Sequence, residues 1–112
     1  MPCSIIAAAC KNEYYPNDEA YFEALTTALK YEYEAVINAG FLLQVDCPDL
    51  ASGWNNQFAD LTLAQFGDIV RLHLEVLDEA TRDVPPDRLR LHLCCCSAAV
   101  AAVLAAAPAA AA

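Results

Sequence analysis

The chain has 112 residues, with six Lys plus Arg against fifteen Asp plus Glu and a formal net charge of −9. This acidic balance argues against a nucleic-acid partner, because phosphate binding needs basic side chains, and against a polybasic membrane anchor. The apolar fraction of 58% is too high for a chain that is disordered throughout, so we expect one small folded domain.

The first clear element is a helix. Residues 4–9 come before it and are too few to distinguish a short buried strand from a loop. Asn17 is a typical N-cap residue, and Gly40 is a typical stop. The apolar positions between them recur at steps of three and four and are Phe22, Leu25, Leu29, Tyr33 and Val36. The acidic residues near the start are expected to form a solvated face with helix-start charge: Glu13, Asp18, Glu19 and Glu23.

A strand is expected directly after Gly40. Alternation over residues 41–46 places Phe41, Leu43 and Val45 on one face. The opposite face would carry Leu42, Gln44 and Asp46. Because proline cannot continue a ladder, Pro48 ends this strand. A loop is expected over residues 49–61.

A second helix and a second strand follow the loop. The spacing from Thr62 to Gln65 is that of a capping box, and an apolar stripe continues to Thr81. His73 lies beside that stripe, which indicates a structural role. After a Pro-rich break, residues 89–94 alternate, with the three leucines on one face. The other face carries Arg90, His92 and Cys94.

Alternating helices and strands predict an α/β protein with a parallel sheet, as in open doubly wound sheets and eight-stranded barrels. No glycine-rich phosphate loop follows either strand, which disfavours the nucleotide-binding version. We expect a domain over residues 1–96 and an alanine-rich, low-complexity tail over residues 97–112. An alanine helix is the better interpretation of the tail. The alternative is a membrane anchor over residues 93–112, which Pro108 and the weak hydrophobicity of alanine disfavour.

Cysteine usage indicates a reducing compartment. Three of the six cysteines are consecutive, which is not the spacing of a secreted disulfide framework. The short apolar stretch near the start has no basic residue before it, so it is not a typical signal peptide. We therefore expect a cytoplasmic protein.

The polar ends of the two strands carry the candidate chemistry. His92 and Cys94 share a face, and an imidazole nitrogen and a thiolate at that separation can bind one zinc ion. The alternative is that His92 is a packed polar residue and the cysteines are small hydrophobes. Asp46 ends its strand where parallel α/β folds place functional groups, although an Asp before Pro48 also suits a turn. Gln44, on the same face, either lines a site or satisfies a buried neighbour.

Four segments occur together in a familiar order. They are residues 12–16, 39–41, 43–50 and 90–94, which read NEYYP, AGF, LQVDCPDL and RLHLC. Together they resemble the C-terminal catalytic domain of cobalamin-independent methionine synthase and its shorter relatives. The resemblance covers roughly residues 12–96, and its specific parts are the segments around Asp46 and His92.

The resemblance implies a (β/α)8 TIM barrel, of which this chain would hold roughly two to three βα units. It implies transfer of a methyl group from 5-methyltetrahydrofolate, in its polyglutamate form, to homocysteine or another thiol. A zinc ion would bind the thiol and lower its pKa. His92 and Cys94 match the first two zinc ligands. Asp46 matches the acid that holds the substrate amino group, with Gln44 beside it as a second substrate-binding candidate.

The departures from the family concern the rest of the site. Family members usually carry an acid where Cys47 stands. Their remaining zinc ligands, a Glu and a second Cys, follow on later strands, whereas this chain continues into alanine. Even if Cys96 served as a third ligand, we expect little activity from this chain alone. The alternative function is that of a truncated or degenerate fragment, or a faulty gene model, acting at most by association with another chain.

Overall fold

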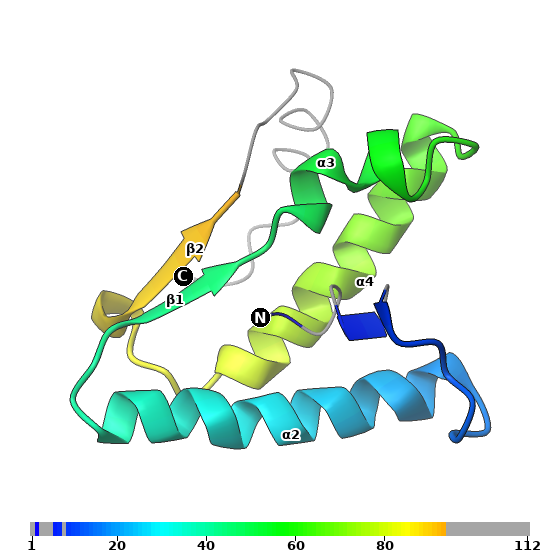
Figure 1. The fold of residues 1–112 in the computed structure, drawn as a ribbon. Coiled ribbons are helices and arrows are strands. Elements are labelled where there is room, and N and C mark those ends of the chain that lie inside the picture. The colour runs from blue at the N-terminus through cyan, green and yellow to red at the C-terminus, as the bar shows by residue number, and fades with distance from the viewer. Residues whose placement is uncertain (1, 3–5, 8, 94–112) are drawn as a thin grey trace.

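The computed structural model describes residues 2, 6, 7 and 9–93. Figure 1 shows two long helices that cross beside a short pair of strands. The elements in chain order are α2 (Asp18–Asn38), β1 (Leu43–Asp46), α3 (Asp49–Asn56), α4 (Leu63–Thr81), the 3₁₀ turn η1 (Pro86–Arg88) and β2 (Leu89–His92).

The two strands pair in parallel, and α3 and α4 form the crossover between them. The register aligns Leu43 with Leu89 at one end and Asp46 with His92 at the other. Beyond the last pair, the backbone N–H of Cys47 donates to the carbonyl oxygen of His92 at 2.9 Å. The expected parallel strands joined by helices are therefore present, while two strands neither support nor oppose the expected partial barrel.

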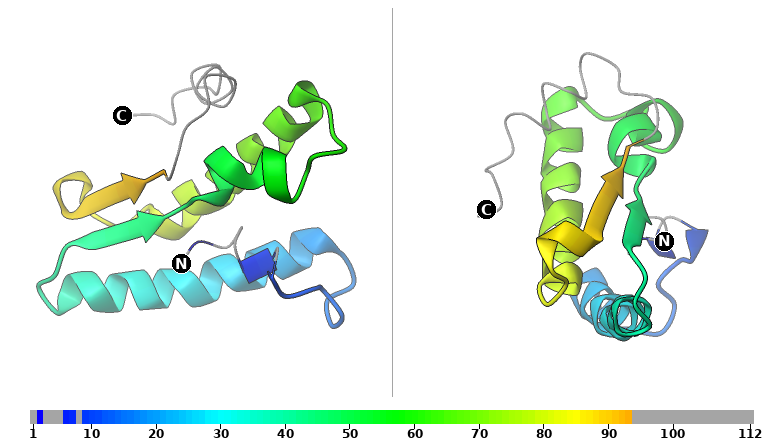
Figure 2. Two further views of the ribbon diagram at one scale, coloured as in Figure 1. Left: turned by 45° about the horizontal axis from the view of Figure 1, so that its top comes forward. Right: turned by 90° about the vertical axis from the view of Figure 1, so that its left-hand side faces the viewer.

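The core lies where β1, α3 and α4 meet. Its largest fully buried side chains include Val45, Leu50, Phe66 and Val70. Helix α2 adds Leu29 and Tyr33 and packs against both α4 and β1 (Figures 1 and 2). Because β1 and the three helices share this core, the positions of the strand ends depend on the packing of the helices.

The helix starts are those expected from the sequence. The side chain of Asn17 accepts a hydrogen bond of 2.8 Å from the N–H of Ala20 at the start of α2. Thr62 and Gln65 form the capping box of α4, with each side chain bonded to the other residue's backbone. Gly40 has φ of 87°, a conformation that glycine adopts at little cost, and the chain turns there into β1.

Helix α3 occupies residues 49–56 of the loop that was expected over residues 49–61, so that prediction was wrong for this part, while residues 57–61 form a loop. Burial of Leu50, Ala51 and part of Trp54 gives this segment one packed face against α4. The Trp54 ring stacks on Phe66, and its Nε1–H donates to the carbonyl oxygen of Leu61 at 3.1 Å. Tertiary packing thus stabilises a short helix whose Gly and Asn content indicated a loop.

Two other expectations also differ from the structure. The first strand begins at Leu43, and Phe41, expected on its buried face, is 66% exposed. Phe41 lies in the turn that follows Gly40, where the alternation of a strand does not yet apply. Near the start, the backbone is helical at Ile6, Ala7 and Ala9, with the N–H of Cys10 bonded to the carbonyl oxygen of Ile6.

Among the helices of the described residues, none combines the length and the hydropathy needed to cross a bilayer. The alanine-rich tail at residues 97–112, with both of its interpretations, lies outside the described residues.

The central role of Phe66 leads to a stability prediction. Its side chain is 1% exposed and contacts the rings of Trp54 and Phe58. Phe66→Ala is expected to lower the free energy of unfolding by about 3–5 kcal/mol, because the cavity it leaves can close only partly. Urea unfolding followed by circular dichroism measures this change. The control Leu63→Ala, on the same helix but 36% exposed, should cost less than about 1 kcal/mol; equal losses would contradict the assigned core.

Candidate functional site

Four polar side chains occupy one face of the strand pair. Gln44 and Asp46 alternate with the buried Leu43 and Val45 along β1. The register pairs Gln44 with Arg90 and Asp46 with His92, and all four polar residues are exposed. We call Gln44, Asp46, Arg90 and His92 the polar quartet. Paired positions of neighbouring strands project to the same side of a sheet, so the quartet forms one surface.

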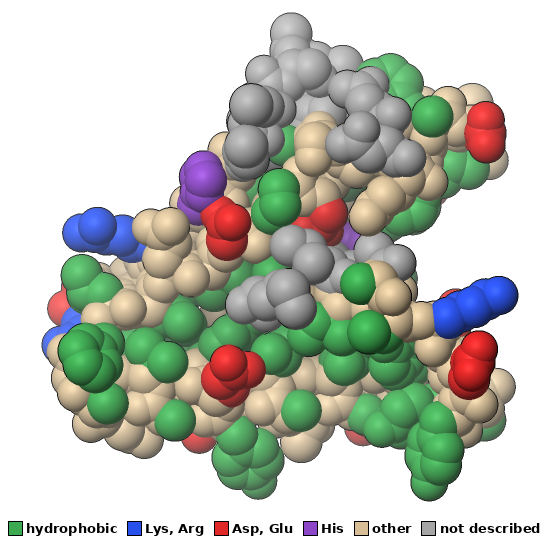
Figure 3. Space-filling view, in the orientation of Figure 1, with side chains coloured by type: hydrophobic (Ala, Val, Ile, Leu, Met, Phe, Trp, Pro, Cys, Tyr) green, Lys and Arg blue, Asp and Glu red, His purple; other side chains and the backbone are tan. Residues whose placement is uncertain are grey.

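The end of the quartet brings together two residues that lie far apart in the sequence. His92 Nδ1 is in hydrogen-bonding contact with Asp46 Oδ1. Both side chains are about half exposed, at 51% and 56%. Figure 3 shows a histidine beside an acidic side chain at the surface, near the ends of the strands. Asp46 and His92, each a candidate from the sequence, therefore lie together at one end of the strand pair.

The contact determines which imidazole nitrogen is available. An ionised carboxylate can only accept, so Nδ1–H of His92 donates to Asp46. In the neutral ring the lone pair then lies on Nε2, the atom that can accept a proton or bind a metal ion. Carboxylates commonly orient metal-binding histidines in this way. Asp46 thus orients His92 through Oδ1, and its second carboxylate oxygen can bind another group.

Zinc fits only part of this arrangement. An imidazole nitrogen and a carboxylate oxygen are both zinc ligands, but a site needs three or four ligands from the protein. Within the described residues, no group of three or more His, Cys, Asp or Glu is placed to hold a metal ion. Cys94, the other expected ligand, lies outside the described residues, as do Cys95 and Cys96. The described residues therefore do not complete a zinc site.

Arg90 is a member of the quartet that the sequence interpretation did not include as a site residue. It shares the face of His92 and pairs with Gln44, so it lies diagonally across from Asp46 on the neighbouring strand. Such diagonal neighbours, two residues along and one strand across, are about 8 Å apart. A carboxylate and a guanidinium at that spacing can bind the two ends of a small zwitterion. The alternation of residues 89–94 already placed Arg90 on this face, but its relation to Asp46 depends on the register.

The residues that follow Asp46 serve the fold. Cys47 is fully buried. Asp49 begins α3, and its Oδ2 lies 3.5 Å from Nδ1 of His73 on α4, with both side chains almost buried. The His73 ring also packs on Phe22 of α2 at 5.8 Å between centroids. His73 and Asp49 therefore link three helices inside the molecule, away from the polar quartet.

The chain matches no known family model, no curated protein and no solved structure. Any function of the chain consequently has to be inferred from its residues and their geometry.

The Asp46 contact predicts the tautomer of His92. At alkaline pH, where imidazole is neutral, His92 should carry its proton on Nδ1, because Asp46 accepts from that atom. Nitrogen-15 NMR of the two ring nitrogens measures this directly. Asp46→Ala should shift His92 toward the Nε2–H form, whereas the control Gln44→Ala should leave the tautomer unchanged. A His92 that is mainly Nε2–H in the unaltered chain would contradict the assigned contact.

Proposed function

We propose that this chain is part of a zinc-dependent methyltransferase of the cobalamin-independent methionine synthase type, built on a partial (β/α)8 barrel. The observation that carries the proposal is the contact between Asp46 and His92. The resemblance assigns these residues to one substrate and metal site, and they lie 46 positions apart in the chain. Their alignment in a parallel register supports that assignment.

The proposed substrate is an amino acid with a thiol, homocysteine or a related compound, and the methyl donor is 5-methyltetrahydrofolate. Asp46 would bind the ammonium group through the oxygen that His92 does not use. Gln44 lies on the same face and would hydrogen-bond to the substrate from the neighbouring position. When bound, zinc would supply the cation that keeps the thiol deprotonated and nucleophilic. His92 and Cys94 are its proposed ligands from this chain, and the remaining ligands would come from outside the described residues.

Arg90 extends this proposal to the substrate carboxylate. The guanidinium group is always charged and bonds to carboxylates in a bidentate manner. With Asp46 on the ammonium group and Arg90 on the carboxylate, the quartet would select α-amino acids over simple thiols. The substrate thiol would then face the His92 end of the sheet.

Zinc binding tests the metal part of the proposal. The purified chain should bind zinc weakly, because the described residues do not complete a site. His92→Ala and Cys94→Ala should each weaken binding further, as measured by calorimetry. Cys10→Ala, which changes an exposed free cysteine, is the matched control. Stoichiometric zinc binding that His92→Ala and Cys94→Ala leave unchanged would contradict the assignment of these two ligands. Rapid methyl transfer by this chain alone would contradict the inference that its active site is incomplete.

Substrate binding tests the role of Arg90. Arg90→Ala should weaken homocysteine binding by about fivefold, as expected for an exposed charged contact worth roughly 1 kcal/mol. NMR titration against the same aminothiol without its carboxylate should show no dependence on Arg90. Arg71→Ala, at an exposed arginine on α4, is the control. Equal effects of the two arginine substitutions would exclude a specific carboxylate contact.

A second candidate function is association with another chain without catalysis. Along β2, Leu91 is 48% exposed, and among the described residues this strand pairs with β1 alone. An unpaired strand edge beside an exposed leucine is a template for strand addition. If the chain served only in this way, neither zinc nor an aminothiol would bind at the quartet.

A further inference from the structure

A groove runs between α2 and α4, on a part of the molecule separate from the polar quartet. Its volume is about 1200 Å³. Apolar side chains contribute to its lining, among them Phe22 of α2 and Leu72 and Val76 of α4. Leu72 is 45% exposed, although it is a large hydrophobic residue. The groove therefore offers an apolar surface that no other described element covers fully.

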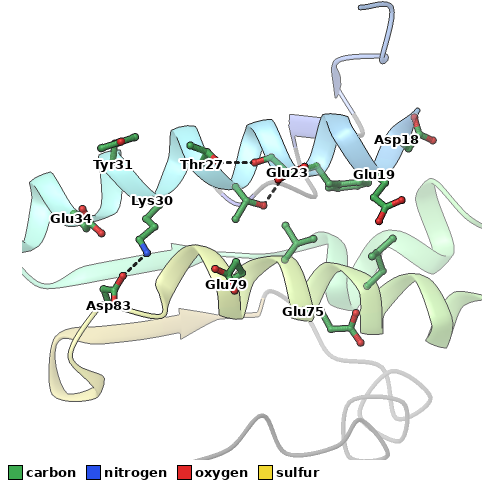
Figure 4. Close-up of a pocket in the computed structure, with 14 residues that line it drawn as sticks. Asp18, Glu19, Glu23, Thr27, Lys30, Tyr31, Glu34, Glu75, Glu79 and Asp83 are labelled. Atoms are coloured by element: carbon green, nitrogen blue, oxygen red, sulfur yellow. Dashed lines mark hydrogen bonds and ion pairs between the residues drawn. The ribbon is translucent and has the colours of Figure 1, made fainter. Parts of the chain in front are cut away.

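Acidic side chains surround this apolar surface. Seven of the fifteen acidic residues of the chain line the groove, so the negative charge is concentrated there. They come from both sides, as Figure 4 shows. Helix α2 contributes Asp18, Glu19, Glu23 and Glu34. Helix α4 and the residue two beyond its end contribute Glu75, Glu79 and Asp83.

The one basic residue of the groove does not offset this charge. Lys30 forms an ion pair with Asp83 across the groove (Figure 4). The hydrogen bond to Asp83 raises the pKa of Lys30, and the charges of Asp83, Glu34 and Glu79 raise it further. The same contact with Lys30 lowers the pKa of Asp83. The acids around Lys30 thus favour its charged form. Five further acids of the groove belong neither to the Lys30–Asp83 pair nor to the Glu79–Arg82 pair.

We propose that the groove between α2 and α4 binds a basic amphipathic helix of a partner protein. The apolar face of such a helix would pack on Phe22, Leu72 and Val76. Its Lys and Arg side chains would reach the acids on both sides, which is the helix-in-groove mode of recognition. Charge complementarity would speed the encounter and fix the orientation of the helix.

Two other occupants fit the observations less well. A second copy of this chain carries the same net charge of −9 and would meet the groove with like charge. A metal ion needs three or more ligands around one point, and the described residues contain no such group. The acids are distributed along two helices, which suits an extended cationic partner.

The test uses the whole chain and a designed peptide. An 18-residue peptide with Leu at helical spacing and Lys elsewhere would span about 27 Å as a helix. Fluorescence anisotropy should show binding that weakens as salt is added. A peptide of the same composition in scrambled order keeps the charge but loses the apolar face, and it should bind at least about tenfold more weakly, a difference of about 1.4 kcal/mol.

Charge-matched variants locate the binding site. Changing Glu23, Glu34 and Glu75 together to Gln should weaken binding by about tenfold. The control triple removes the same charge from exposed positions outside the groove: Glu32→Gln, Asp60→Asn and Asp78→Asn. It should change the affinity less than about twofold. Leu72→Ala should weaken binding as well, with Leu63→Ala as its control, and circular dichroism verifies that each variant folds.

Three results would overturn the proposal. Equal weakening by the two triple variants would show attraction by net charge alone. Equal binding of the ordered and scrambled peptides, or no binding of either, would exclude the apolar groove as a helix site. A dimer that forms without peptide, and that Leu72→Ala disrupts, would assign the groove to a second copy of the chain.

Discussion

The parallel register of β1 and β2 is the constraint on which the candidate site depends. Side chains alternate between the two faces of a strand, so a shift of one residue would move His92 away from Asp46. The backbone bond from Cys47 to His92 extends the ladder past the last pair and holds the two strand ends together. Because the crossover between the strands contains α3 and α4, that register also depends on how those helices pack.

The buried contact between Asp49 and His73 links the site to this packing. Asp49 lies three residues after Asp46 and begins α3, where a negative charge is favoured by the helix dipole. His73 on α4 contacts the Asp49 carboxylate, and its ring also packs on Phe22 of α2. Within the segment from Asp46 to Asp49, Asp46 therefore faces solvent, whereas Cys47 and Asp49 are buried.

The sequence predicted what depends on local chemistry. Asn17, Thr62 and Gln65 form caps through side chains a few residues away, so their roles could be assigned from spacing alone. Alternation likewise placed Gln44 and Asp46 on one face. Helix α3 could not be predicted in this way, because its stability comes from Phe66 and α4. The contact of Asp46 with His92 and the place of Arg90 beside it needed the register, which joins residues 46 positions apart.

The acidic charge requires a physical explanation of its own. Charges that serve only solubility would be spread evenly, since like charges close together destabilise the folded state. Here α2 and α4 lie against each other and bring the acids of both helices around one groove. Among the described residues that line the groove, Lys30 is the one cation, and it is bound to Asp83. The exposed Leu72 lies in the same groove, so concentrated negative charge and unburied apolar surface coincide there. Both features would be matched by one kind of partner, a helix that is basic on its sides and apolar on the face that it presents.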